Sequence, residues 1–201
     1  MLTLWTNPMS RGRIARWMLE ELGEPYETKV LAYGPEMQSA DFLAVNPMGK
    51  VPCLQHNGQV VTELAAICAF LAESYPAKGL NARDRASFLR WLFFAAGPLE
   101  AAVLNRSFGW EPQGQQQGRA GYGSFERTVA ALSGWLGSRD YIADERFTAA
   151  DVYIGGQVIF GLGFGTLPQE RALIAYAERL QTRPAFLAAA AKDDALLAQK
   201  A

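Results

Sequence analysis

Val51-Pro52 and Glu63 lie at the two ends of a predicted β-hairpin and carry groups that could bind another molecule. Val51-Pro52 begins an apolar run, and a proline inside a hairpin strand forfeits one hydrogen bond of the strand ladder. The backbone groups beside it are therefore available to a different partner. Glu63 stands where a helical pattern begins, and the helix dipole favours a carboxylate there whatever its function.

The elements that must position these groups follow from apolar spacing and turn signals. Asn57-Gly58 supplies the positive φ angles that a tight hairpin turn needs. Ile14, Met18 and Leu22 recur four residues apart, as on one face of a helix. The predicted order is a strand at 2–6, a helix at 11–22, a strand at 26–31, a short helix or turn at 37–44, the hairpin, and a helix from 63.

This order is typical of a small mixed sheet and is too compact for a dinucleotide-binding fold. The polar stretch "PAKGLNARDR", with its Pro and Gly, predicts a linker before a region without strand signals. In that region Thr148 and Asp151 have the spacing of a helix capping box. The glycines of "FGLGFGTLP" are expected to allow close helix packing or a bend. The alanine-rich tail after Arg183-Pro184 is expected to fray.

The composition excludes several classes of function. The 201 residues include 19 basic and 20 acidic ones, so neither nucleic acid nor a membrane surface is an expected partner. Neither a signal peptide nor a long apolar stretch is read in the sequence. Cys53 and Cys68 form no CxxC pair and are expected to be buried free thiols of a reducing cytosol. His56 is the single histidine, which argues against a metal cluster or a histidine-dependent triad.

Three motifs, taken together, resemble the cytosolic glutathione transferase superfamily. They are "NPMGKVP", then "TELAAICAFLAESYP" after the hairpin, then "FTAADVYIG", and the resemblance covers nearly the whole chain. The N-terminal stretch "TNPMSRGRIARWMLEELGEPYE" is similar to bacterial members. The resemblance implies a thioredoxin-like domain at 1–77, a linker at 78–84, an all-helical domain at 85–201, a cytoplasmic location and a homodimer.

The same resemblance implies a glutathione site around the hairpin. Pro52 matches a proline with a cis peptide bond, so that the N–H and C=O of Val51 would pair with the tripeptide as an added strand. Glu63 would bind the ammonium of the γ-glutamyl group, and the helix N-terminus would bind the adjacent carboxylate. Leu64 departs from the family, which usually has Ser or Thr there, so about 1.5–3 kcal/mol of hydrogen bonding is expected to be absent unless Thr62 or a neighbour replaces it.

Further residues are implied at the ends of the tripeptide and at its thiol. Lys50 and Gln38 are candidates for contact with the glycyl carboxylate. The thiol needs a hydroxyl donor, since only a few per cent of a free thiol is ionised at pH 7. Ser10 is the hydroxyl nearest the first helix, although it is equally suited to an N-cap. Asn7 and the backbone or side chain of Arg11 are the alternatives.

The second-substrate site is implied between the domains, lined by the first helix of the helical domain and the loop after it. Its candidate residues are Phe94, Asn105, Phe108, Trp110 and Tyr122. The function implied is addition of the glutathione thiolate to an electrophilic, mostly apolar substrate, with glutathione as co-substrate and no other cofactor. The alternatives are a glutathione-dependent peroxidase, isomerase or dehalogenase, or a non-catalytic binding protein of the same fold.

Overall fold

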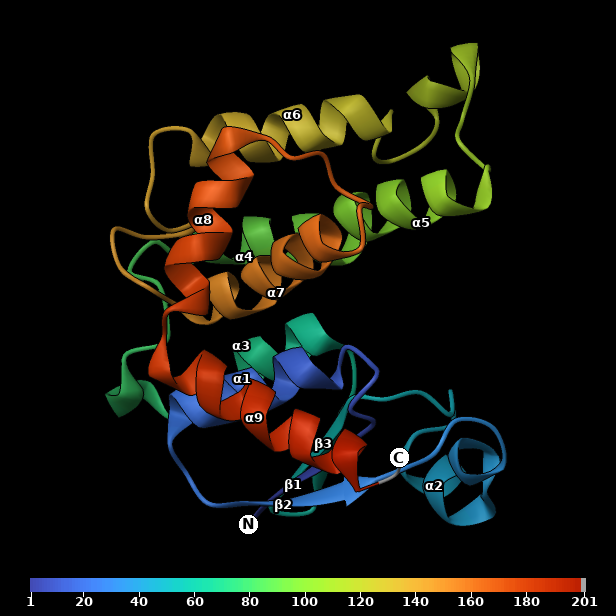
Figure 1. Cartoon of the computed structure of the whole chain (residues 1–201), viewed down its shortest axis with the longest axis vertical. Helices are drawn as coiled ribbons and strands as arrows, with labels where there is room; N and C mark the ends of the chain where they lie inside the picture. Colours follow the sequence, from blue (N-terminus) through green and yellow to red (C-terminus); the bar gives the residue numbers. More distant parts are fainter. Residues whose placement is uncertain (200–201) are drawn as a thin grey trace. The chain divides into compact units, whose positions relative to one another are not determined.

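The computed structural model describes residues 1–199 and divides into two compact units (Figure 1). The first unit comprises Met1–Gly79 together with the segment from Thr182 onward, and the second comprises Leu80–Gln181. Residues 182–201 were expected to belong to the helical domain, whereas in the structure the segment that follows residue 181 packs with the first unit.

A four-stranded mixed sheet forms the centre of the first unit. Its strands are β1 (Leu2–Thr6), β2 (Tyr26–Val30), β3 (Cys53–His56) and β4 (Gln59–Val61), in the order β2-β1-β3-β4. β1 pairs with β2 in parallel and with β3 antiparallel, and β3 pairs antiparallel with β4. Asn57 and Gly58 have φ angles of 50° and 84°, which confirms the tight turn predicted between β3 and β4.

The helices of the first unit follow the predicted order. Before residue 80 they are α1 (Gly12–Leu22), α2 (Ala40–Val45) and α3 (Leu64–Ser74), with short 3-10 helices at Pro35–Gln38 and Pro76–Lys78. The predicted apolar face of α1 is buried, and Gly23 ends the helix in the left-handed conformation with φ 68°. α1 contacts both α3 and the C-terminal helix, so two helices pack against it.

The C-terminal tail is ordered as helix α9 (Pro184–Ala198), and the prediction that it frays is wrong over the described residues. α9 lies beside α1, as Figure 1 shows, and Phe186 packs edge-on against Trp17 with ring centroids 5.1 Å apart. Tertiary contacts therefore stabilise a segment whose alanine-rich pattern gives no strong apolar face.

Over residues 80–181 the second unit consists of helices joined by loops and contains no strand. Its helices are α4 (Arg85–Phe94), α5 (Glu100–Phe108), α6 (Phe125–Leu136), α7 (Ala149–Gly163) and α8 (Arg171–Gln181). A π-helical segment, Ala95–Leu99, joins α4 to α5 and contains Pro98. The resulting helical run, Arg85–Phe108, is long and apolar enough to cross a membrane by length and composition, a test that core helices of soluble proteins also pass.

The predicted capping box starts α7. The buried Asp151 carboxylate accepts hydrogen bonds from the backbone N–H groups of Thr148 and Ile142 at 2.8 and 2.7 Å, and from the Tyr176 hydroxyl at 2.9 Å. Burial raises the pKa of Asp151 to about 6, although these donors act to lower it. At the other end of α7, a Cβ on Gly161 would lie 2.5 Å from Leu167 in the loop that follows, and Gly165 has a φ of 70°. Gly161 thus allows close packing and Gly165 a bend, whereas nothing lies within 4 Å of a Cβ on Gly163.

Candidate functional site

Val51 offers free backbone groups at the start of the hairpin. Its peptide bond to Pro52 is cis, as the resemblance implied, and its side chain packs against the cluster of Met37, Phe42 and Cys53. Within residues 1–199, neither the N–H nor the C=O of Val51 forms a hydrogen bond with the protein. An extended peptide could therefore pair with both groups as an added strand.

Asn46 holds the turn that leads into Val51 and was not singled out from the sequence. It is buried, its Nδ2 donates to the Lys50 carbonyl at 2.7 Å, and its Oδ1 accepts from the Met48 N–H at 3.1 Å. Its carbonyl accepts from the Gly49 N–H at 2.9 Å. The Asn-Pro-x-Gly spacing is a turn signal that could have identified this role from the sequence.

Gln38 and Lys50 are brought to the same turn from two segments. Both side chains are exposed. A Cβ on Gly49 would lie 2.6 Å from Nε2 of Gln38 and 2.7 Å from the Met37 carbonyl oxygen, so the Gln38 amide lies against the residue that precedes Lys50. The Gln38 amide and the backbone that leads into Lys50 are therefore neighbours.

Glu63 is the N-cap residue of α3 and has an unusual backbone conformation, with φ 63° and ψ 114°. Its side chain is exposed and makes no capping hydrogen bond. A non-glycine residue with such a φ angle costs about 1–3 kcal/mol and is often found at ligand sites. The carboxylate is therefore directed to solvent rather than used to cap its own helix.

The first turn of α3 presents backbone donors beside Glu63. The Ile67 N–H bonds to the Glu63 carbonyl at 2.9 Å, whereas no acceptor for the Leu64 N–H is found in the described part of the chain. The Leu64 side chain is buried, so it offers no polar group of its own. Thr62, the residue considered as its substitute, is half-buried just before the helix.

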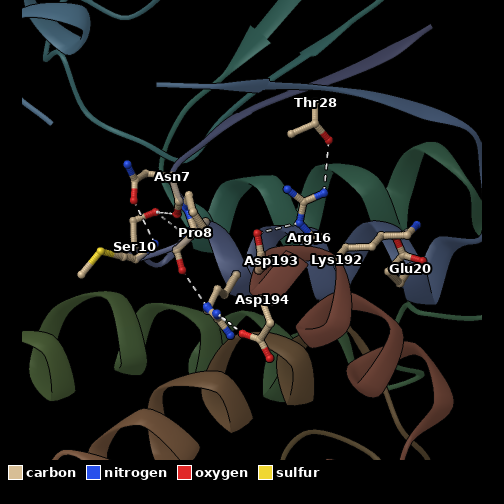
Figure 2. Close-up of polar contacts among 12 residues, drawn as sticks. Asn7, Pro8, Ser10, Arg16, Glu20, Thr28, Lys192, Asp193 and Asp194 are labelled. Carbon is tan, nitrogen blue, oxygen red and sulfur yellow. Dashed lines mark hydrogen bonds and ion pairs between the residues drawn. The ribbon is translucent and has the colours of Figure 1, made fainter. Parts of the chain in front are cut away.

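Ser10 uses its hydroxyl locally in the loop between β1 and α1. The Oγ donates to the Asn7 carbonyl at 2.7 Å and accepts from the Gly12 N–H at 2.9 Å, as Figure 2 shows for the contact with Asn7. Ser10 thus bonds within the turn just before the N-cap residue Arg11, and no side chain caps α1. A thiolate would have to compete with the Asn7 carbonyl for the hydroxyl proton. The catalytic role of Ser10 stays a prediction.

Asn7 and Arg11, the alternatives to Ser10, differ in burial. Asn7 is buried, its Nδ2 donates to the Leu31 carbonyl at 2.7 Å, and its Oδ1 accepts from the Met9 N–H at 2.9 Å. Asn7 thus shapes the loop and has its amide engaged. Arg11 is exposed at the N-cap position of α1.

Gly12 allows this loop to lie close to β1. A Cβ at this position would stand 1.9 Å from Oγ1 of Thr6 and 2.9 Å from Oγ of Ser10. Thr6 is fully buried, so it has no room to give way. The close approach brings Ser10 to the end of the central strand.

The second-substrate candidates all belong to the second unit, and the structure groups four of them. Asn105 donates from Nδ2 to the Tyr122 hydroxyl at 3.0 Å, and the exposed Phe108 and Trp110 rings pack with centroids 4.8 Å apart. Phe94 packs against Trp91 and precedes Asn105 by eleven residues, about 16 Å along a helix axis. The structure therefore forms two pairs near the end of α5 and leaves Phe94 apart from them.

The cysteines and the histidine have structural surroundings. Cys53 and Cys68 are buried and unbridged, as predicted, and burial raises the pKa of the Cys53 thiol to about 11 and that of Cys68 still further. His56 Nε2 lies 3.1 Å from the Tyr75 hydroxyl. Over residues 1–199, no group of three or more His, Cys, Asp or Glu side chains could hold a metal ion.

Several known proteins are similar to this chain over most of its length. A family model described as "Glutathione S-transferase, N-terminal domain" matches residues 9–74, which include the hairpin and Glu63. Glutathione S-transferase GST-4.5 of Xanthomonas campestris pv. campestris is 30% identical over 149 residues, which are 65% of this chain and 68% of that protein.

Two further matches extend over more of the chain. The maleylacetoacetate isomerase of Pseudomonas aeruginosa is 30% identical over 166 residues, which are 76% of each protein. A solved structure of a sphingomonad glutathione S-transferase complexed with glutathione is 28% identical, covers 96% of this chain and 98% of its own, and superposes with a TM-score of 0.77.

Proposed function

The chain belongs to the cytosolic glutathione S-transferase superfamily, and we propose that it binds glutathione and transfers it to an electrophile. It has the N-terminal thioredoxin-like domain and the C-terminal helical domain of that superfamily. The observation that carries the proposal is the pair of free Val51 backbone groups close in sequence to the outward carboxylate of Glu63 at the start of α3. The relation to a sphingomonad enzyme that binds glutathione supports it.

Each part of glutathione has a complementary group in the first unit. The cysteinyl backbone would pair with Val51, and the γ-glutamyl ammonium would meet Glu63. The α-carboxylate would accept from the N–H groups at the N-terminus of α3, where the helix dipole favours an anion. The glycyl carboxylate would lie near Lys50 and Gln38. Three charged contacts would thus fix the tripeptide along the edge of the hairpin.

The reaction requires the thiol to lose its proton near neutral pH. We propose that Ser10 gives up its hydrogen bond to the Asn7 carbonyl and donates to the thiolate instead, while keeping its contact with the Gly12 N–H. The N-terminus of α1 would add a favourable field, since a thiolate there has a lowered pKa. The sulfur would then attack the electrophilic carbon of an apolar substrate and displace its leaving group or add to its double bond.

The apolar second substrate would contact residues of the second unit. The exposed Phe108–Trp110 pair supplies apolar surface, and the Asn105–Tyr122 pair supplies polar groups beside it. Phe94 would contribute to this site only at some distance from the other four. These assignments stay proposals.

An isomerase is the second candidate function, because the maleylacetoacetate isomerase is similar over three quarters of both chains. In an isomerase the thiolate would add to a carbon–carbon double bond, allow rotation about it, and leave again. Glutathione would then be regenerated rather than consumed. The two functions are therefore separable by the fate of glutathione.

Retention on glutathione-agarose, followed by a chromogenic conjugation assay, tests the proposal. A transferase is retained and consumes one glutathione per product. An isomerase is retained, converts a cis-unsaturated diacid, and leaves the glutathione concentration unchanged. Retention without turnover of either substrate would identify a binding protein, and lack of retention would contradict glutathione binding altogether.

We also propose a homodimer in the cytoplasm, as the resemblance implied. Sedimentation at micromolar concentration should give a species of twice the 22.0 kDa chain mass. A single 22.0 kDa species would contradict the dimer.

A further inference from the structure

Arg13 links the loop between β1 and α1, here called the Asn7–Ser10 loop, to the C-terminal helix α9. Its Nε donates to the Pro8 carbonyl at 2.7 Å, and its Nη2 donates to Oδ1 of Asp194 in α9 at 2.5 Å. Arg13 is half-buried, with about a quarter of its side chain (26%) exposed. The Arg13 guanidinium therefore joins the loop at Pro8 to the helix at Asp194, both within the first unit. Figure 2 labels Pro8 and Asp194.

Three further ion pairs align α9 with α1. Arg16 bonds to Asp193 at 2.9 Å with both side chains buried, and Lys192 bonds to Glu20 at 2.6 Å. Arg183, just before α9, forms a forked pair with Glu21 at 2.6 and 2.7 Å. Later residues of α1 pair with earlier residues of the C-terminal segment, so α9 is antiparallel to α1. Asp193 and Asp194, near the end of α9, therefore lie close to the Asn7–Ser10 loop.

The Asn7–Ser10 loop is thereby held at successive residues from different segments. Asn7 is tied to Leu31 after β2, Pro8 is tied through Arg13 to α9, and the Tyr33 hydroxyl donates to the Met9 carbonyl at 3.2 Å. The Pro8 contact lies two residues before Ser10 and depends on how the Arg13 guanidinium is turned. Asp194 fixes that orientation, because Arg presents its donors in a rigid fork.

We propose that Asp194 is a positioning residue that acts through Arg13 on the Asn7–Ser10 loop, so that the C-terminal helix sets the place of the thiol-activating hydroxyl. The proposal rests on the proposed function in assigning the thiol to this loop. Asp194 is 65% exposed, and an exposed ion pair contributes little to stability. Its effect is therefore expected in the geometry of the loop rather than in the melting temperature.

Amide hydrogen exchange of the unliganded protein tests the link without glutathione. The reporters are the Ser10 N–H, bonded to the Asn7 carbonyl, and the Gly12 N–H, bonded to the Ser10 Oγ. In Asp194→Ala their exchange should accelerate by up to about fivefold, the upper limit set by loss of one exposed pair. Asp194→Glu should restore wild-type exchange. Lys192→Met, which breaks an exposed pair of the same helix away from the loop, should leave both amides unchanged.

Turnover of the same variants tests the consequence. Asp194→Ala should lower kcat by up to about fivefold with an unchanged KM for glutathione, and Asp194→Glu should recover kcat. Unchanged exchange in Asp194→Ala overturns the proposal. Faster exchange with wild-type kcat overturns it as well, since the link would then be structural only. Faster exchange in a chain that does not bind glutathione would support the link to the loop and contradict the proposed function instead.

Discussion

The hairpin region at residues 46–67 and the loop at residues 7–10 belong to the same compact unit, but contacts of different range position them. Asn46, the Asn57-Gly58 turn and the start of α3 shape the turns of the hairpin region with bonds inside that segment, while β3 also pairs with β1. The loop at 7–10 is held by Leu31, Tyr33 and, through Arg13, by Asp194. The turns that carry the proposed binding groups are thus shaped locally, while the loop that carries the proposed thiol-activating group depends on the C-terminal helix.

The difference implies that the two regions respond differently to substitution. Changes in the hairpin region should alter glutathione affinity with little effect on folding. Changes in the contacts of α9 should alter folding or turnover with little effect on affinity. Four substitutions, from the largest expected effect to the smallest, test this separation.

Arg16→Met should break the long-range support most severely. The Arg16 guanidinium is buried beside Asp193 and also donates to the Thr28 hydroxyl. Burial acts to lower the pKa of Arg16, but the Asp193 charge and the Tyr26 hydroxyl leave that pKa raised overall. Removing one partner of a buried pair costs about 3–5 kcal/mol, because the other charge is left buried and alone. Urea unfolding should show this loss, and Arg16→Met/Asp193→Leu should regain much of it. A single variant as stable as the wild type would show that α9 is not held by this pair.

Glu63→Ala should weaken glutathione binding at the hairpin region without unfolding the chain. Loss of one charge-assisted bond predicts glutathione binding weaker by about 1.5–3 kcal/mol, which calorimetric titration measures directly. Glu63→Gln is the matched control, since it keeps the acceptor and removes the charge, and its affinity should be intermediate. Wild-type affinity in a folded Glu63→Ala protein would remove Glu63 from the site.

Ser10→Ala separates the catalytic interpretation from the capping one. If Ser10 donates to the thiolate, its loss should raise the pKa of bound glutathione by about one unit, or 1.36 kcal/mol. Turnover near neutral pH should then fall roughly tenfold, while the affinity for glutathione changes little. The ultraviolet absorbance of the bound thiolate, followed against pH, reports the shift. As a cap only, the serine should account for about 1 kcal/mol of stability, with an unchanged thiol titration. The second result would direct attention to Asn7 and Arg11.

Lys50→Ala should have the smallest effect. Lys50 is exposed, and an exposed ion pair contributes about 0.2–1 kcal/mol, so glutathione affinity should fall by less than about fivefold. The loss should shrink as the salt concentration rises, because screening weakens an exposed pair. A salt-independent loss would mean that Lys50 acts through the turn it shares with Asn46 and Gly49 rather than by its charge.

The sequence by itself determined the elements whose signals are local. The tight turn follows from Asn57-Gly58, because few residues other than Asn and Gly adopt positive φ angles readily. The start of α7 follows from Thr148 and Asp151, because a capping box needs only three residues of spacing. The fold class and the candidate residues around Val51 and Glu63 came instead from the resemblance of three sequence motifs to the glutathione transferase superfamily. The roles of those residues stay predictions.

The tertiary structure alone decided where the C-terminal helix and the Asn7–Ser10 loop lie. Residues 184–198 have an alanine-rich pattern with no strong apolar face, so nothing local indicated that α9 would pack on α1. Arg13 and Asp194 are 181 residues apart, and Gly12 is required because Thr6 lies against it in space. Contacts of such separation form only after the sheet and both helices are in place, and for that reason no short stretch of sequence encodes them.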